Sequence, residues 1–96
     1  MHAVIRMYSG PGAKKLCDFI EERKSEIESL ARPIKGFVSY TVFRTADGGS
    51  SLTVCQDKAG CDEGARIARE WIQKNASSIN VNPPAVSEGS VIVHLK

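Results

Sequence analysis

Residues 36–56, GFVSYTVFRTADGGSSLTVCQ, carry the clearest fold signal in this 96-residue chain. Residues 36–45 are rich in aromatic and β-branched side chains, which favour a strand. The segment Ala46-Asp47-Gly48-Gly49 follows with the turn residues of a hairpin. Residues 50–56 alternate apolar and polar side chains, as a half-buried strand does. The stretch therefore predicts an antiparallel hairpin.

A helix is predicted on each side of this hairpin. Residues 13–32 repeat apolar side chains every three or four positions, and Pro33 ends the pattern because the residue before a proline avoids helical angles. Residues 58–77 follow Asp57, a good N-cap residue. Each helix has one apolar stripe, so both should cover the same face of a sheet. The stripe of the first helix consists of Leu16, Phe19, Ile20, Ile27, Leu30 and Ala31. In the second helix Ala68, Trp71, Ile72, Asn75 and Ala76 share one face, which is apolar except for Asn75.

The two ends of the chain supply the outer strands. Residues 2–8 alternate with a period of two, and residues 89–95, GSVIVHL, are rich in β-branched side chains. A loop over residues 77–87 precedes the last strand. The order β-α-β-β-α-β with two right-handed crossovers predicts an α+β ferredoxin-like plait. It forms one domain, residues 1–96, whose antiparallel four-stranded sheet has the order 4-1-3-2 and carries two helices on one face.

Alternation also sorts the strand residues onto two faces. We expect the helix-covered face to carry Ala3, Ile5, Met7, Leu52, Val54, Val91, Val93 and Leu95. The opposite face would then carry Val4, Arg6, Tyr8, Thr53, Cys55, Ile92 and His94. For residues 36–45, alternation does not decide which of the two sets of side chains faces the helices. We favour Phe37, Ser39, Thr41 and Phe43 on the opposite face. That face is too apolar for a solvated sheet, so a second copy is its simplest cover and a homodimer is predicted.

Composition and charge exclude several classes of protein. A hydrophobic content of 42% and a charged content of 25% are typical of a globular domain. The net charge of +2 comes without a block of like charge, so no nucleic-acid surface is predicted. No apolar run approaches the ~18 residues of a membrane span. Residues 1–8 do not resemble a signal peptide, so we expect a cytoplasmic protein.

The cysteines, the histidines and the first loop show no pattern of a metal or phosphate site. Cys17, Cys55 and Cys61 include no CxxC pair, and His2 and His94 stand at opposite ends of the chain. Neither a disulfide framework nor a metal site is therefore predicted. The SGPG segment at residues 9–12 lacks the GxxxxGK[ST] spacing of a phosphate-binding loop, so it is predicted to be a turn.

Three residues of the outer strands form the candidate catalytic site. These strands are neighbours in the predicted order, so His94 would meet Arg6 and Tyr8. A histidine is the usual general base near neutral pH, and an arginine can stabilise an oxyanion. We therefore take His94 as the base, with Arg6 and Tyr8 steering a substrate oxygen; the alternative is a structural histidine in an interface. The predicted ligand-lining residues are Thr53, Cys55, Phe43 and Trp71, although Cys55 and Trp71 also suit a core.

Four segments resemble one known group of proteins: the strand–SGPG–helix opening, IKGFVSYTVFRTADG, QDKAGCDEGARIAREW and SEGSVIVHL. Together they cover nearly the whole chain and are similar to the antibiotic-biosynthesis-monooxygenase-like group of the dimeric α/β-barrel superfamily. The resemblance implies a dimer with a pocket, either between each sheet and its helices or between the two sheets. The group includes cofactor-free monooxygenases, haem-degrading enzymes and isomerases. The histidine of the haem-degrading relatives has no counterpart in or beside the helix of Trp71, so no cofactor is predicted.

These observations leave three functional hypotheses. The first is a small homodimer that binds a small, largely apolar organic molecule. The second is a cofactor-independent monooxygenase or isomerase that acts on an aromatic or quinol-like substrate. The third is a structural or regulatory dimer without a pocket. Whether the chain is an enzyme stays open at this point.

Overall fold

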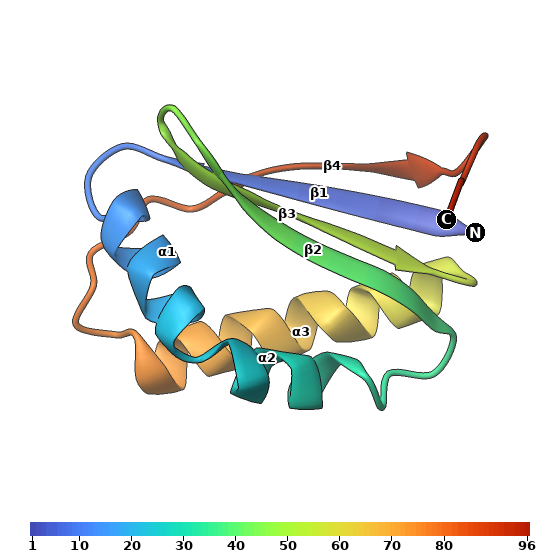
Figure 1. The fold of residues 1–96 in the computed structure, drawn as a ribbon, viewed down its shortest axis with the longest axis horizontal. Helices are drawn as coiled ribbons and strands as arrows, with labels where there is room; N and C mark the ends of the chain where they lie inside the picture. The colour runs from blue at the N-terminus through green and yellow to red at the C-terminus, as the bar shows by residue number, and fades with distance from the viewer.

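The computed structural model describes residues 1–96, and its four strands form one antiparallel sheet with all helices on one face (Figure 1). The sheet order β2-β3-β1-β4 is the predicted order, and the ferredoxin-like α+β architecture is confirmed. None of the helices combines the length and the hydrophobicity that a membrane span requires. The elements are β1 (His2–Ser9), α1 (Ala13–Glu22), α2 (Lys24–Ala31), β2 (Phe37–Thr45), β3 (Gly48–Cys55), α3 (Lys58–Asn75) and β4 (Ala85–Ser90).

The predicted hairpin is present and is closed by the two-residue turn Ala46-Asp47, because Thr45 already pairs with Gly48. The register then runs without a break until Ser39, which pairs with Val54. A β-bulge follows, and Phe37 pairs with Cys55. This extra residue turns Phe37 toward the helices, where it packs against the buried core.

The predicted faces of β1 and β3 are wrong: the structure reverses them. Arg6 and Thr53 are buried on the side of the helices, whereas Met7 is 44% and Leu52 is 38% exposed on the other side. Alternation fixes which residues share a face, but it does not fix which face meets the helices. Close contacts of β3 decide this point, because a side chain at Gly49 would meet Cys17 of α1 and one at Gly64 of α3 would meet Thr53.

The sheet face that points away from the helices is called the free face below. The register places Thr41 opposite Leu52 and Phe43 opposite Ser50, so the favoured assignment of these β2 residues to the free face is confirmed and only Phe37 differs. None of the residues that alternation and pairing place on the free face is charged. They are Ala3, Ile5 and Met7 of β1, Ser39, Thr41 and Phe43 of β2, Ser50, Leu52 and Val54 of β3, and Ala85, Ser87 and Gly89 of β4.

The single helix predicted over residues 13–32 is two helices that meet at Arg23, where φ is −111°. The break coincides with a gap in the apolar stripe, because residues 21–26 offer no apolar side chain between Ile20 and Ile27. A full turn without a core contact lets the backbone bend at low cost. As a consequence, α2 contains no fully buried residue. The second predicted helix is confirmed, and Asp57 caps it by accepting a 3.1 Å hydrogen bond from the Gly60 amide.

The predicted last strand, residues 89–95, is displaced: β4 spans Ala85–Ser90. The reason lies in the length of β1, since Ser90 pairs with His2 and the Val91 amide donates to the carbonyl of Met1. No pairing with β1 is present beyond this point. Val91, Val93 and Leu95 are therefore not part of the helix-covered face, and Ile92 and His94 are not part of the sheet.

Gly49 provides a test of the packing between the hairpin and α1. A methyl group at this position would collide with Cys17 Sγ and lie 3.2 Å from the Phe43 carbonyl oxygen. We expect Gly49→Ala to lower the free energy of unfolding by about 1–3 kcal/mol, measured by urea denaturation. Gly64→Ala is the control, because a methyl group there would make only ordinary contacts, at 3.5 Å from Ile34 and 3.8 Å from Thr53. An equal loss for Gly49→Ala in a Cys17→Ala background would contradict this explanation.

Candidate functional site

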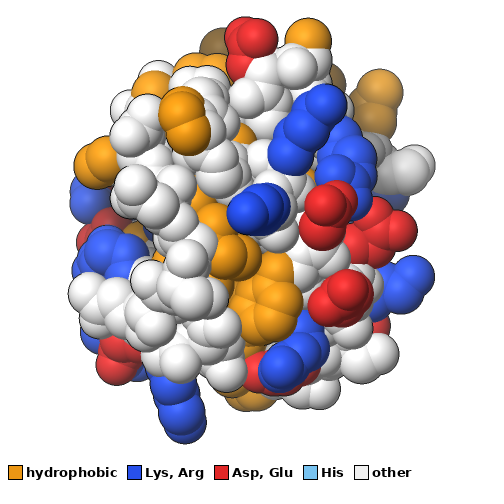
Figure 2. All heavy atoms as spheres, turned by 90° about the vertical axis from the view of Figure 1, so that its left-hand side faces the viewer, with side chains coloured by type: hydrophobic (Ala, Val, Ile, Leu, Met, Phe, Trp, Pro, Cys, Tyr) orange, Lys and Arg blue, Asp and Glu red, His pale blue; other side chains and the backbone are white.

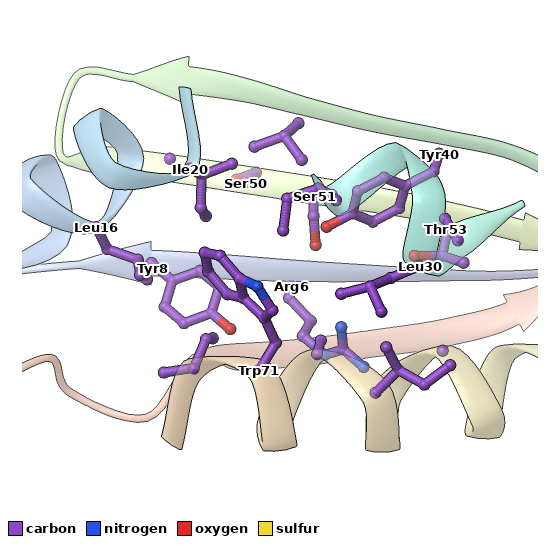
Figure 3. A pocket seen from close by; sticks show the side chains of 18 of the residues that line it. Arg6, Tyr8, Leu16, Ile20, Leu30, Tyr40, Ser50, Ser51, Thr53 and Trp71 are labelled. Atoms are coloured by element: carbon purple, nitrogen blue, oxygen red, sulfur yellow. The ribbon is translucent and has the colours of Figure 1, made fainter. Parts of the chain in front are cut away.

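A pocket lies between the sheet and the helices, and it is lined by all three helices and by β1, β2 and β3 (Figure 3). Most of its lining is apolar, and the enclosed space is about 70 Å³. Viewed from one end of the molecule, the surface is hollowed between charged side chains, and hydrophobic side chains form the floor of the hollow (Figure 2). Of the two pocket positions that the resemblance left open, the single chain therefore forms the one beneath the helices.

Arg6 is the only charged side chain in the lining of this pocket. Alternation along β1 points it toward the helices, where it is only 7% exposed. It takes part in none of the ion pairs of the chain. A buried charge without an acidic partner is costly, and such groups concentrate at functional sites.

Two tyrosines supply hydroxyl groups to the same pocket. Tyr8 follows Arg6 on the same side of β1, and Tyr40 of β2 lies opposite Thr53 (Figure 3). Burial raises the pKa of Tyr8 and of Tyr40, and the Arg6 charge opposes this rise in both. Both phenols therefore stay protonated at neutral pH and can donate hydrogen bonds. A cation beside two neutral donors suits a negatively charged oxygen.

Trp71 connects α3 with α2 above the pocket. Its indole Nε1–H donates a 2.7 Å hydrogen bond to Glu26 Oε1, and its ring lies 5.4 Å from that of Phe19, centroid to centroid. This hydrogen bond, followed by one from Arg23, lowers the pKa of Glu26. The Trp71–Glu26 hydrogen bond therefore joins α3 to α2, a helix that has no fully buried residue.

Acid should loosen this attachment. Since the Glu26 pKa is lower in the folded protein, the contact stabilises the fold above the ordinary glutamate pKa of about 4.3 and is lost as the pH falls through the folded value. Trp71 is the only tryptophan, so its fluorescence reports the change. We expect an emission shift as the pH falls below the ordinary glutamate range in the original chain and none in Glu26→Gln, which keeps a neutral acceptor. Identical titrations of the two proteins would disprove the assignment.

The structure brings together some of the residues predicted for the site. Arg6, Tyr8, Thr53 and Trp71 all line the pocket. It does not bring His94 to Arg6 and Tyr8, because that histidine lies in the C-terminal segment beyond β4 and outside the pocket. Cys55 is fully buried in the core beside the pocket, and Phe43 is on the free face.

Tyr40 and Ser51 line the pocket but were not among the predicted site residues. A signal for Tyr40 exists in the hairpin. Once Ala46-Asp47 is taken as a two-residue turn, counting back along both strands pairs Tyr40 with Thr53. Ser51 follows from the same count, since it pairs with both Val42 and Arg6.

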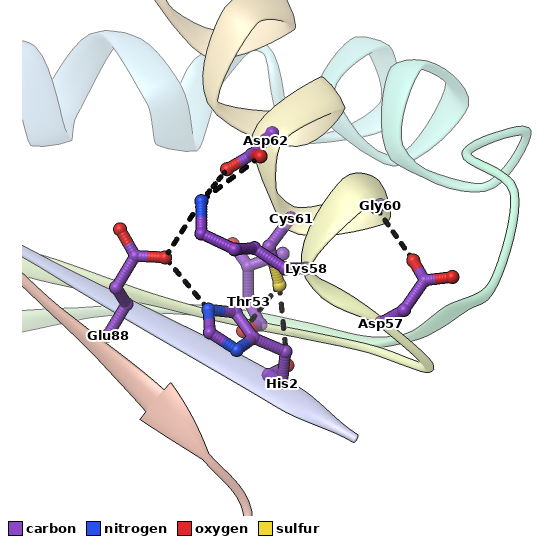
Figure 4. Close-up of polar contacts among 8 residues, drawn as sticks. All are labelled: His2, Thr53, Asp57, Lys58, Gly60, Cys61, Asp62 and Glu88. Carbon is purple, nitrogen blue, oxygen red and sulfur yellow. Dashed lines mark hydrogen bonds and ion pairs between the residues drawn. The ribbon is translucent and has the colours of Figure 1, made fainter.

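A second polar cluster joins β1, β4 and the start of α3 (Figure 4). His2 Nε2 and Glu88 Oε1 are 2.8 Å apart, and Lys58 Nζ lies 3.0 Å from Asp62 and 3.7 Å from Glu88. The hydrogen bond with His2 is the largest cause that lowers the pKa of Glu88. These contacts fasten β4 to the rest of the fold. Nowhere in the chain do three His, Cys, Asp or Glu side chains lie together so that they could hold a metal ion.

Cys61 lies beneath this cluster, with Sγ 3.3 Å from the His2 carbonyl oxygen (Figure 4). Burial, followed by the effect of the neighbouring Cys55, raises the pKa of Cys61 to about 11. Cys61 is therefore a thiol at neutral pH, and thiols are poor nucleophiles.

Comparison with known proteins places the fold, although no family profile and no curated protein matches the chain by sequence. A Nitrosomonas europaea protein of unknown function superposes with a TM-score of 0.71 at 18% identity, covering 99% of this chain and 91% of that one. A Streptomyces coelicolor monooxygenase, from the gene ActVA-Orf6 and in complex with nanaomycin D, superposes with a TM-score of 0.67 at 17% identity. The match covers 99% of this chain and 89% of that one. A putative monooxygenase from Shewanella loihica superposes with a TM-score of 0.54 at 19% identity, and the match covers 97% of this chain and 95% of that one.

Proposed function

We propose that the protein binds a small, largely apolar organic molecule that carries an ionised oxygen. Its fold is that of the antibiotic-biosynthesis-monooxygenase-like proteins, which supports this proposal. The body of the ligand lies beneath the helices against the apolar lining, and its oxygen faces Arg6, Tyr8 and Tyr40. The observation that carries this proposal is Arg6, a buried cation without an acidic partner. An anionic ligand supplies the partner that the chain lacks.

The size of the pocket sets a condition on this binding. Ligand sites usually enclose about 300 Å³ or more, whereas this space is about 70 Å³. An aromatic ligand therefore enters only when part of the roof moves. The α2 helix is the part that moves most easily, because it has no fully buried residue and because Arg23 separates it from α1.

A homodimer is part of the proposal. The free face exposes apolar side chains such as Phe43, Leu52 and Met7 and carries no charge. A partner surface that fits it must also be uncharged, and a second free face meets this condition. The cytoplasmic location expected from the sequence stays a prediction.

A cofactor-independent monooxygenase or isomerase with a quinol-like substrate is the second candidate. It is favoured by the solved monooxygenase that shares the fold and holds nanaomycin D. Arg6 and the two tyrosines would hold the ionised form of a phenol or quinol, which is the electron-rich form. Uptake of dissolved oxygen on mixing with hydroxylated naphthalenes would support this candidate, and no uptake with any of them would remove it. The role of His94 as base stays a prediction.

The primary test uses 4-nitrophenol, whose phenolate absorbs visible light. A phenol bound beside Arg6 should ionise about 1 pKa unit lower than it does in buffer, which appears as phenolate absorbance at a lower pH. The neutral ether 4-nitroanisole should bind at least about tenfold more weakly. Equal binding of the two compounds would overturn the anionic class. No binding of either would favour a structural dimer without a useful pocket.

A further inference from the structure

An open groove lies between the end of α2 and the start of α3, and we call it the α2–α3 groove. Ser29 and Leu30 of α2, the connection over residues 33–36 and the first turns of α3 from Ala59 onward line it. Its volume is about 750 Å³, whereas the pocket beneath the helices encloses about 70 Å³. The groove therefore offers the space that the pocket lacks.

The pocket and the α2–α3 groove share one wall, because Leu30, Ile34 and Ile67 line both of them. Figure 3 shows Leu30 at the same end of the pocket as Thr53, away from Leu16. Ile34 is buried, but Leu30 is 36% exposed. An exposed leucine changes rotamer readily, so Leu30 is the part of the wall that can turn aside most easily.

A second groove, of about 420 Å³, borders the pocket on the other side of α2, next to β2. Ion pairs cross that side, since Arg44 of β2 lies 2.9 Å from Asp18 and 2.7 Å from Glu21 of α1. No ion pair crosses the α2–α3 groove. Trp71 and Glu26, whose hydrogen bond connects the two helices, do not line it either. The α2–α3 side is thus the open side of α2.

The lining of the α2–α3 groove indicates what kind of group it accepts. The shared wall is aliphatic, and a passage between branched aliphatic side chains suits a thin chain better than a second ring. A second anionic group is disfavoured, because Asp57 and Glu63 line the groove and Lys35 is the only cation there. A neutral alkyl chain meets both conditions.

We propose that the ligand is an amphipathic acid, whose ionised oxygen lies beside Arg6 and whose uncharged alkyl chain passes Leu30 into the α2–α3 groove. This inference rests on the proposed function and deepens it, because it names the second half of the molecule. It also meets the size condition, since the pocket then has to enclose only the head of the ligand and the groove receives the rest.

The first experiment varies the chain on a visible probe. The 2-alkyl-4-nitrophenols keep the 4-nitrophenolate chromophore and carry a methyl, butyl or octyl chain. Each methylene that the groove covers should tighten binding about threefold, so the octyl compound should bind at least about 30-fold more tightly than the methyl compound. The ratio of these two affinities is the measured quantity, because it cancels effects on the nitrophenol ring.

The second experiment locates the chain. Ala59→Trp fills the α2–α3 groove from an exposed position on α3, and the ratio should fall below about fivefold. Lys24→Trp is the matched control, because it places the same side chain in the groove on the other side of α2 and should leave the ratio unchanged. Circular dichroism checks that both variants are folded.

The outcomes separate this inference from the proposed function. No gain with chain length, or an undiminished ratio in Ala59→Trp, would overturn the alkyl subsite and leave the anion site at Arg6 standing. A ratio that falls in Lys24→Trp and not in Ala59→Trp would place the chain on the wrong side of α2 and overturn it as well. No binding of any of these phenols would remove the anion site and the subsite together.

Discussion

Replacement of Arg6 by leucine is expected to weaken the binding of 4-nitrophenolate by about 100-fold or more, because an ion-paired hydrogen bond in a buried site contributes about 3 kcal/mol. The same replacement should leave the free energy of unfolding unchanged or raise it. Arg6 is only 7% exposed and has no acidic partner, so leucine removes a charge that no carboxylate of the chain offsets. Lower affinity together with undiminished stability is the signature of a residue kept for binding.

Arg69→Leu is the control for this experiment. It removes the same charge from an exposed position on α3 and should change neither the affinity nor the stability. The affinity of Arg6→Lys for 4-nitrophenolate should lie between those of the original chain and of Arg6→Leu. Lysine keeps the charge, but its single ammonium group lacks the planar fork of N–H donors of arginine. If Arg6→Leu lowers the free energy of unfolding and leaves the ligand affinity unchanged, Arg6 is structural and the proposed site is wrong.

Replacement of Leu52 by lysine is expected to convert the proposed dimer into monomers, with a dissociation constant raised about 1,000-fold. Leu52 lies in the middle of the free face, opposite Ile5 on one side and Thr41 on the other. In a twofold interface each substitution acts twice, and an ammonium group buried there without a partner is costly. The monomer should stay folded, because Leu52 is already partly exposed in the single chain.

Val86→Lys is the control for Leu52→Lys. Val86 lies opposite Arg6 on β4, so it is on the side of the sheet away from the free face. Analytical ultracentrifugation should find this variant dimeric wherever the original chain is dimeric. A Leu52→Lys variant that dimerises as tightly as the original chain would exclude the free face as the interface.

The local signals in the sequence were reliable where one residue type has one strong preference. Asp57 capped α3 as predicted, and the two-residue turn Ala46-Asp47 joined the two strands of the hairpin. The strand order followed from connection rules that depend only on element order. These features need no knowledge of distant contacts.

The errors arose where a distant contact decides between equal local choices. The alternating set Ala3, Ile5 and Met7 of β1 is wholly apolar and therefore favoured the wrong face, so the sequence alone did not show that Arg6 would point toward the helices. The position of β4 was set by the end of β1 at His2 and not by the β-branched residues 91–95. Tyr40 was missed because the site residues were sought on the face away from the helices, whereas the favoured assignment of β2 already left Tyr40 on the side of the helices.

The break at Arg23 also bears on how such a protein can diversify. The floor of the pocket is the hydrogen-bonded centre of the sheet, where most changes would endanger folding. Ile27, Leu30 and Ala31 of the roof belong to a short helix that contributes little to the core. Substitutions at these positions can retune ligand preference at small cost to the scaffold, so related chains should differ most in selectivity where they differ along this helix.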